Sequence, residues 1–252
     1  MIGLDKACNV STTHNDRVGQ SPIVQVESAS LYVLKEGPVS AQEELARIAA
    51  EVNVCTLCPL AKGRTHAVPG EGPADAEIMF IGEGPGFHED RQGRPFVGAA
   101  GQFLEELLAS VGLKRQQVFI ANVVKCRPPG NRDPLPEELS ACRPYLDRQI
   151  EALRPKVIVT LGRYSMARYF PTASISQVHG QPRRVGDFYI LPMFHPAAGL
   201  HQPRWRPVIE EDFKKLPALL AEARQLRAQP APKNEENGPD GPTDQYQQLS
   251  LF

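Results

Sequence analysis

The 252-residue chain lacks the features that would place it in a membrane or a secretory pathway. No run of apolar residues approaches the length that spans a bilayer. The first ten residues carry Asp5 and Lys6 with no apolar stretch behind them, so no signal peptide is expected. Cysteine is scarce, and four of the five cysteines have a spacing unlike that of a secreted disulfide scaffold. We expect a soluble, cytoplasmic protein.

An excess of positive charge is also absent. The chain has 28 Lys and Arg against 29 Asp and Glu, a formal charge of -1, which argues against a generally polycationic nucleic-acid binder. The distribution is uneven, because residues 114–168 contain eleven basic and five acidic side chains. A basic face on the folded core and a set of separate, solvated arginines both account for this excess.

A glycine-rich acidic stretch, residues 82–90 (GEGPGFHED), follows the apolar run 77–81. This run has the length and the β-branched, aromatic character of a buried strand. The glycines then fall where the strand ends, and there the backbone can approach a ligand closely. No Gly-Lys-Ser/Thr follows, and Glu83 would repel a pyrophosphate, so a nucleotide-binding loop is disfavoured.

Helical patterns and short apolar runs alternate along the middle of the chain. Helices are expected within 40–52, 101–111, 133–150, 165–170 and 206–227, and strands at 77–81, 118–124, 156–161 and 188–193. This alternation predicts a three-layer α/β/α fold with a mainly parallel, four-stranded central sheet. Ligands bind such sheets at the carboxyl ends of the strands, where Glu83, Asn122 and His195 are expected.

Composition divides the chain into four parts. Residues 1–38 are predicted to be a mobile leader, 39–227 one globular domain, and 228–247 a disordered linker rich in proline and polar residues. The last five residues, 248–252, resemble the short peptide by which bacterial replication and repair proteins bind the sliding clamp. A frayed apolar tail is the alternative. The clamp-binding side chains would be Gln248, Leu249, Leu251 and Phe252.

Four cysteines have the spacing of a metal site. Cys55 and Cys58 form a C-x2-C pair, and Cys126 and Cys142 follow after gaps of 67 and 15 residues. Four thiolates hold either zinc or a [4Fe-4S] cluster, and spacing alone does not choose between them. Buried thiols without metal are the third interpretation. Cys8 has no evident partner.

Four separated motifs carry a resemblance to a known family. Residues 82–86, 89–98, 122–129 and 195–198, together with the four cysteines, closely resemble the family 4 uracil-DNA glycosylases over about residues 40–220. The resemblance implies an enzyme that removes uracil from DNA, single or double stranded, and starts base excision repair. It also implies that the cysteines hold a [4Fe-4S] cluster rather than zinc.

The chemistry of such an enzyme gives each motif a task. A glycosylase extrudes the target nucleotide, stacks the base and reads its Watson-Crick edge. Phe96 suits the stacking, and the Asn122 amide can accept from uracil N3–H and donate to O4. Ordinary core packing for Phe96 and a strand-end cap for Asn122 are the alternatives. The loop residues expected to bind the substrate with them are Gly84, Pro85 and Gly86.

Cleavage of the glycosidic bond leaves negative charge on uracil and positive charge on the sugar. His195 and nearby backbone N–H groups are expected to stabilise the anion at uracil O2. Glu83 is expected to orient the attacking water or to balance the sugar cation. The glycine-rich loop of family 4 lacks the aspartate that activates water in the best-known uracil glycosylases, so the resemblance itself does not identify the group that activates water. A purely structural histidine is the alternative.

Several side chains are expected to hold the DNA. Leu200 would fill the space that the flipped base leaves, although Gly199 before it departs from the bulkier residue expected in the family. The side chains expected to contact phosphates are Lys125, Arg127, Arg204 and Arg206. We expect a monomer. A non-catalytic DNA-binding protein with the same fold is the main alternative, and covalent relatives are disfavoured because residues 98–113 contain no basic insert.

Overall fold

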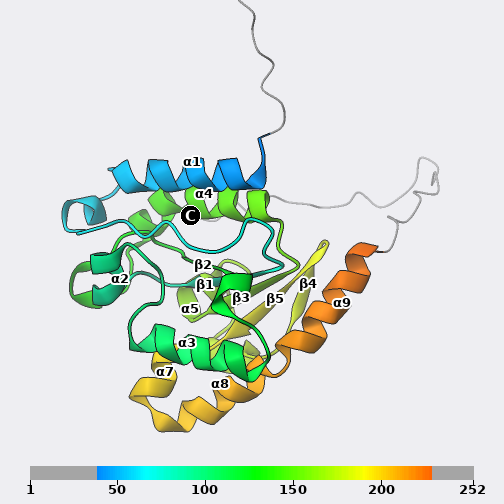
Figure 1. Cartoon of the computed structure of the whole chain (residues 1–252). Coiled ribbons are helices and arrows are strands. Elements are labelled where there is room, and N and C mark those ends of the chain that lie inside the picture. Colours follow the sequence, from blue (N-terminus) through cyan, green and yellow to red (C-terminus); the bar gives the residue numbers. More distant parts are fainter. Residues whose placement is uncertain (1–38, 229–252) are drawn as a thin grey trace, which may run out of the picture. The chain divides into compact units, whose positions relative to one another are not determined.

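The computed structural model describes residues 39–228 (Figure 1). The predicted leader, the predicted clamp-binding peptide and all but the first residue of the predicted linker lie outside this range. Within it, no helix is both long enough and apolar enough to cross a membrane.

The centre of the fold is a five-stranded sheet with the order β2-β1-β3-β5-β4. Four strands run parallel, and β4 pairs antiparallel with β5. The strands are β1 (Ile78–Gly82), β2 (Phe119–Asn122), β3 (Val157–Leu161), β4 (Arg183–Val185) and β5 (Phe188–Met193). The parallel strands confirm the predicted α/β fold, whereas the prediction of four strands was wrong by one. The short strand β4 carries two exposed arginines and gives no apolar signal.

Alternate residues of the parallel strands face two hydrophobic layers. Phe80 and Val159 pack with α3, α8 and α9 on one face, and Met79 and Ile158 pack with α1 and α4 on the other. Figure 1 shows these helices above and below the sheet. Because both faces of the sheet are covered, every residue of β1 and β3 is buried, in agreement with their predominantly apolar sequences.

The helices largely follow the expected pattern. They are α1 (Ala41–Val54), α2 (Phe87–Gln92), α3 (Ala99–Ser110), α4 (Pro136–Leu153), α5 (Arg163–Ala167), α6 (Ile175–Val178), α7 (Pro196–His201), α8 (Arg206–Phe213) and α9 (Leu216–Ala228). The start of α1 is a capping box, in which the Glu43 N–H donates to Ser40 Oγ at 3.2 Å and the Ser40 N–H to Glu43 Oε2 at 2.8 Å.

The single helix predicted over 206–227 is instead two helices. Pro217 has no N–H to donate to α8 and would clash with the preceding turn of a continuous helix. It is accommodated in the first turn of α9 instead. The buried Asp212 carboxylate accepts from Lys215 Nζ at 2.9 Å at this break. The described residues end with α9, whose last residue is Ala228.

Candidate active site

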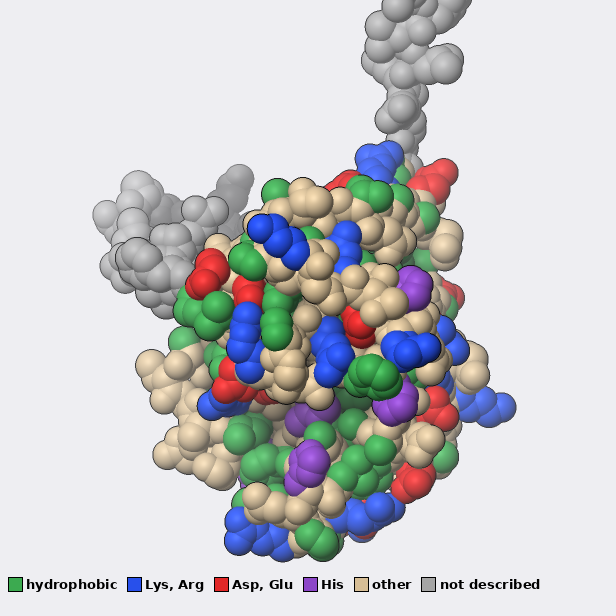
Figure 2. Space-filling model, turned by 90° about the vertical axis from the view of Figure 1, so that its left-hand side faces the viewer, with side chains coloured by type: hydrophobic (Ala, Val, Ile, Leu, Met, Phe, Trp, Pro, Cys, Tyr) green, Lys and Arg blue, Asp and Glu red, His purple; other side chains and the backbone are tan. Residues whose placement is uncertain are grey.

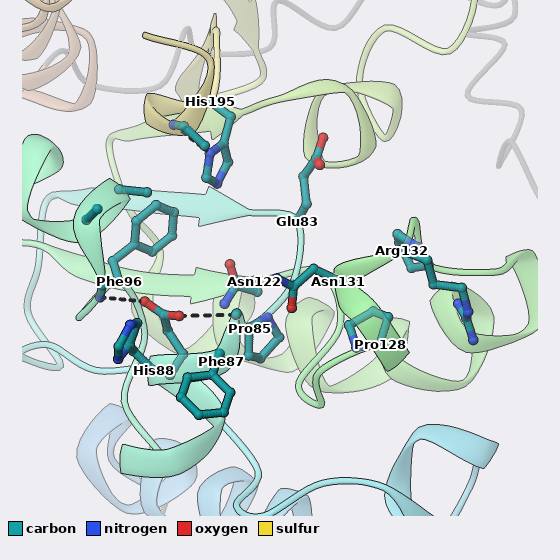
Figure 3. A pocket seen from close by; sticks show the side chains of 18 of the residues that line it. Glu83, Pro85, Phe87, His88, Phe96, Asn122, Pro128, Asn131, Arg132 and His195 are labelled. Atoms are coloured by element: carbon teal, nitrogen blue, oxygen red, sulfur yellow. Dashed lines mark hydrogen bonds between the residues drawn. The ribbon is translucent and has the colours of Figure 1, made fainter. Parts of the chain in front are cut away.

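A cavity of about 500 Å³ opens at the carboxyl ends of the parallel strands. Its walls come from the glycine-rich loop after β1, the segment before α3, the end of β2, the loop that follows it and the start of α7 (Figure 3). On the molecular surface, histidine and apolar side chains gather around a hollow, with Lys and Arg side chains above it (Figure 2). The predicted residues that line the cavity are Glu83, Gly84, Pro85, Gly86, Phe96, Asn122 and His195.

Asn122, the last residue of β2, brings an unpaired acceptor to this cavity. The residue is 2% exposed, and its Oδ1 has no hydrogen-bond partner among the described residues. Gly82 on the neighbouring strand makes room for it, because a Cβ there would lie 2.4 Å from Asn122 Oδ1 and 2.7 Å from Phe96 Cε2. A buried acceptor without a donor costs about 1–3 kcal/mol, and this oxygen is therefore free to accept a hydrogen bond at the cavity.

Phe96 forms one wall of the cavity. It is 5% exposed and has a φ of 50°, a left-handed conformation that is uncommon for a phenylalanine. Its carbonyl accepts from Arg115 Nη1 at 3.0 Å, which helps hold this backbone in place. The Phe96 ring stacks on the ring of His195, with centroids 5.4 Å apart and an angle of 25°. Backbone strain of this kind is characteristic of functional sites.

His195 lies directly before α7 and is held as a neutral donor. Its Nδ1 accepts from the Ala197 N–H at 3.1 Å, so in the neutral ring the proton is assigned to Nε2. Burial lowers the pKa of His195 to about 4, so the ring is uncharged at neutral pH. Figure 3 shows the rings of His195 and Phe96 and the Asn122 amide around the same space.

Glu83 lines the cavity but turns toward α5, away from Phe96 and Asn122 (Figure 3). Its Oε1 accepts from the Tyr164 N–H at 3.2 Å in the first turn of that helix. Gly162 has a φ of 94°, and a Cβ there would lie 2.5 Å from Glu83 Oε1. Burial raises the pKa of Glu83 above its usual range, and the backbone donors oppose this shift.

Comparison with known proteins decides the family. A family model described as the uracil DNA glycosylase superfamily matches residues 69–221. A type-4 uracil-DNA glycosylase from Sulfurisphaera tokodaii is 50% identical over an alignment of 187 residues, with 70% of this chain and 85% of that protein covered. The chain belongs to the type-4 uracil-DNA glycosylases.

Further relatives of the glycosylase carry the same description. The Archaeoglobus fulgidus protein is 48% identical, with 70% of this chain and 94% of the relative covered. The Thermotoga maritima protein is 45% identical, with 71% and 96% covered. The family predicted from the four motifs is therefore confirmed. The relatives include both archaeal and bacterial proteins, so they do not single out the bacterial source that the resemblance of residues 248–252 to a bacterial clamp-binding peptide implies.

Glu89 is a site residue of the glycosylase to which the sequence analysis gave no role. Its carboxylate accepts from three backbone N–H groups, those of Gly86 at 3.1 Å and of Val97 and Gly98 at 2.8 Å. It thereby ties the glycine-rich loop to the segment that carries Phe96. The sequence signal that could have identified this role is the position of Glu89, three residues after Gly86 at the start of α2. A glutamate at this position commonly accepts from the backbone N–H of the residue that caps the helix.

The loop after β2 adds further lining residues that sequence reasoning did not assign to the pocket. They are Pro128, Asn131, Arg132, Asp133 and Pro134. Asn131 has a φ of 57°, and its Oδ1 accepts from Arg127 Nε at 2.7 Å. Arg132 pairs with the buried carboxylate of Glu138 at 2.6 Å. A loop with no apolar pattern gives no sequence signal for which of its side chains face the cavity.

The predicted phosphate contact of Lys125 was wrong. Its side chain is buried, with 1% of the residue exposed. Its Nζ donates to the Asn122 carbonyl at 2.9 Å and to Gln149 Oε1 at 2.6 Å, and burial lowers the Lys125 pKa to about 8. Lys125 therefore supports the end of β2 from inside the fold and does not reach DNA.

The other predicted DNA contacts lie on the surface, outside the cavity lining. Leu200 is 41% exposed at the end of α7, and Arg204 is exposed beside Trp205. Arg206 already pairs with Glu106 at 2.7 Å and Glu210 at 2.9 Å. Arg127 is half-buried. The DNA-binding roles of these four residues stay predictions.

The four cysteines of the glycosylase surround a second, small cavity. It lies between the C-terminal end of helix α1 and the middle of helix α4. Cys126 Sγ accepts from Arg64 Nη1 at 3.3 Å, and Cys142 Sγ from the Lys125 N–H at 3.2 Å. In residues 39–228, no three Cys, His, Asp or Glu side chains have the arrangement of a single-ion site. Cysteine sulfur ligands that accept hydrogen bonds from N–H groups fit the environment of an iron-sulfur cluster.

Proposed function

We propose that the glycosylase hydrolyses the bond between uracil and deoxyribose in DNA, releases free uracil and starts base excision repair. The observation that carries this proposal is the buried, unpaired Asn122 Oδ1 at the cavity. Uracil N3–H is a donor at the position where such an acceptor is needed, and the amide NH₂ of the same side chain can donate to O4. Cytosine presents the reverse pattern and would leave both groups unsatisfied.

The flipped uracil would lie against Phe96 with its O2 toward His195. Cleavage places negative charge on the leaving base, and a fixed neutral donor stabilises that charge without a change in protonation. The Nε2–H of His195 supplies this donor, since Nδ1 is already occupied by the Ala197 N–H. Gly84, Pro85 and Gly86 form the adjoining wall of the cavity.

Glu83 would act on the sugar side of the reaction. Its carboxylate lines the cavity while the first turn of α5 holds it in place. An ionised carboxylate there balances the developing sugar cation or orients the attacking water. Water is then the nucleophile, and no covalent intermediate forms. In agreement, residues 99–110 are a regular helix, α3, with no inserted basic loop.

The cofactor of the proposed enzyme is a [4Fe-4S] cluster held by Cys55, Cys58, Cys126 and Cys142. Its contribution would be structural, because the cysteines join the end of α1, the segment after β2 and α4, and none of them lines the active-site cavity. The cluster cross-links three parts of one layer of the fold.

Asn122→Asp tests the recognition proposal. An aspartate retains one acceptor but cannot donate to O4 and buries a charge, so we expect uracil release to fall about 10- to 100-fold. Single-turnover release of free base from uracil-, cytosine- and thymine-containing single strands and duplexes measures the change. Asn53→Asp, at an exposed position of α1, is the matched control. A parent protein that binds these strands without releasing uracil would instead be the non-catalytic DNA-binding protein.

The terminal peptide, residues 248–252, is proposed to bind the sliding clamp through Gln248, Leu249, Leu251 and Phe252. Deletion of these five residues should abolish binding to the cognate clamp in a titration. Cleavage of a short uracil-containing oligonucleotide should be unaffected, because the residues that line the cavity all lie between 83 and 201. Equal clamp affinity of both proteins would contradict the proposal.

A further inference from the structure

Phe87, the first residue of α2, is an exposed aromatic side chain at the cavity. Six large apolar residues are exposed within residues 39–228, and Phe87 alone among them lines the cavity. It is 48% exposed. Figure 3 shows its ring beside that of His88, and the two rings meet edge to face with centroids 5.4 Å apart. The ring therefore offers apolar surface next to the space proposed for uracil.

Two cations accompany this ring. The Arg127 guanidinium lies 5.3 Å from the ring centroid and that of Arg91 lies 5.8 Å from it. Neither arginine pairs with a carboxylate among the described residues, whereas Arg94 and Arg132 nearby both do. Asn131 Oδ1 orients Arg127 by accepting from its Nε at 2.7 Å. An exposed aromatic ring beside two cations that have no carboxylate partner in the described part of the chain is the pattern of a single-strand-binding surface.

Packing does not account for Phe87. The helix it begins is held by other residues, since Glu89 accepts from three backbone N–H groups and the buried Asp90 Oδ1 accepts from the Thr65 N–H at 2.9 Å. None of the three buried core clusters of residues 39–228 includes Phe87. A half-exposed phenylalanine at a binding cavity is therefore available to a ligand.

We propose that Phe87 stacks against the base next to the flipped uracil, while Arg91 and Arg127 contact the adjoining phosphates. This inference rests on the proposed action on DNA and adds a second base-binding position to it. Stacking on an aromatic ring is tolerant of sequence because every base has a π-face. The position would hold the strand at the cavity when no complementary strand is present.

Replacement of the ring tests the proposal on a single-stranded oligonucleotide with one uracil. Phe87→Ala and Phe87→Leu should raise the half-saturating enzyme concentration in single-turnover assays by roughly tenfold or more. Phe87→Tyr keeps an aromatic ring and should have the half-saturating concentration of the parent enzyme. Leu135→Ala, at another exposed apolar residue but outside the cavity lining, is the control and should leave it unchanged. Melting temperatures of all variants report whether they fold.

Substrates without the neighbouring base separate stacking from other roles of the ring. A tetrahydrofuran abasic analogue replaces the nucleotide on the 5′ side of uracil in one oligonucleotide and on the 3′ side in another. For the parent enzyme, one of the two abasic substrates should need a higher half-saturating concentration than the intact strand, by the same factor as the Phe87→Ala substitution causes. For Phe87→Ala, both abasic substrates should give the same half-saturating concentration as the intact strand. The proposal would be overturned if the abasic substitutions weakened binding equally in the parent enzyme and in Phe87→Ala. It would also be overturned if replacing Phe87 weakened binding only to duplex substrates. A parent that releases no uracil would instead refute the proposed function.

Discussion

Replacing His195 with alanine is expected to lower the single-turnover rate constant of uracil release by about 10²- to 10³-fold. The variant loses the Nε2–H donor directed at the leaving base, and the backbone N–H groups of the cavity remain. Affinity for uracil-containing DNA should change little, because the lost interaction strengthens only as charge develops on the base. Rate constants and DNA affinities measured on the same oligonucleotide separate the two effects.

Two companion measurements show whether His195 acts as a neutral donor. His195→Gln retains an N–H donor and should recover part of the lost rate, whereas an unchanged rate in His195→Ala would move the stabilisation of the anion to the backbone. The pKa of about 4 keeps the ring uncharged between pH 5 and 8, so the rate of the parent should not fall as pH rises through 6.5. A fall there would indicate an imidazolium.

Glu83 should supply the acid side of the same pH profile. Its pKa is raised by burial, so the carboxylate becomes protonated, and the rate falls, at a higher pH than for an ordinary glutamate. Glu83→Gln should be slower than the parent and should lose this decline at low pH. An unchanged decline in the variant would assign it to another group.

Cys142→Ala is expected to cost the protein its iron and most of its stability. Anaerobically purified parent should be brown with about four irons per chain, and the variant should be colourless. Cys142 is buried among Ile48, Val124 and Tyr145, so loss of the cross-link there should lower the melting temperature by roughly 10 °C or more. Iron content, visible absorbance and thermal unfolding measure the outcome.

Cys8→Ala is the matched control for the cluster, because Cys8 lies outside the four-cysteine motif. It should retain full iron and the melting temperature of the parent. Stoichiometric zinc in the colourless parent protein would contradict the cluster and favour the tetrahedral zinc site that the spacing also permits.

The sequence predicted those parts of the site that short motifs carry. Phe96, Asn122 and His195 come from three separate segments, and parallel strands bring their ends to one edge of the sheet. What the motifs could not give was the direction of each side chain. Glu83 was expected near the substrate, but the direction of its carboxylate toward α5 depends on the packing of a helix about 80 residues away.

Three misreadings have a common physical origin in tertiary contacts. Strand β4 forms because β5 offers its edge, although Arg183 and Arg184 carry no apolar pattern. Lys125 has the charge of a phosphate ligand, but its partners are the Asn122 carbonyl and the Gln149 side chain inside the fold. The break after α8 was readable in principle from Pro217, and the continuous apolar spacing around it concealed the break.

The segment from Asn122 to Cys126 joins the two centres of the molecule over a very short stretch of chain. Its first residue carries the unpaired amide oxygen, and its last is one of the four cysteines. Between them, Lys125 donates through Nζ to Asn122 and through its backbone N–H to Cys142 Sγ. A molecule that loses the proposed cluster should therefore also lose the geometry around Asn122 that is proposed to select uracil.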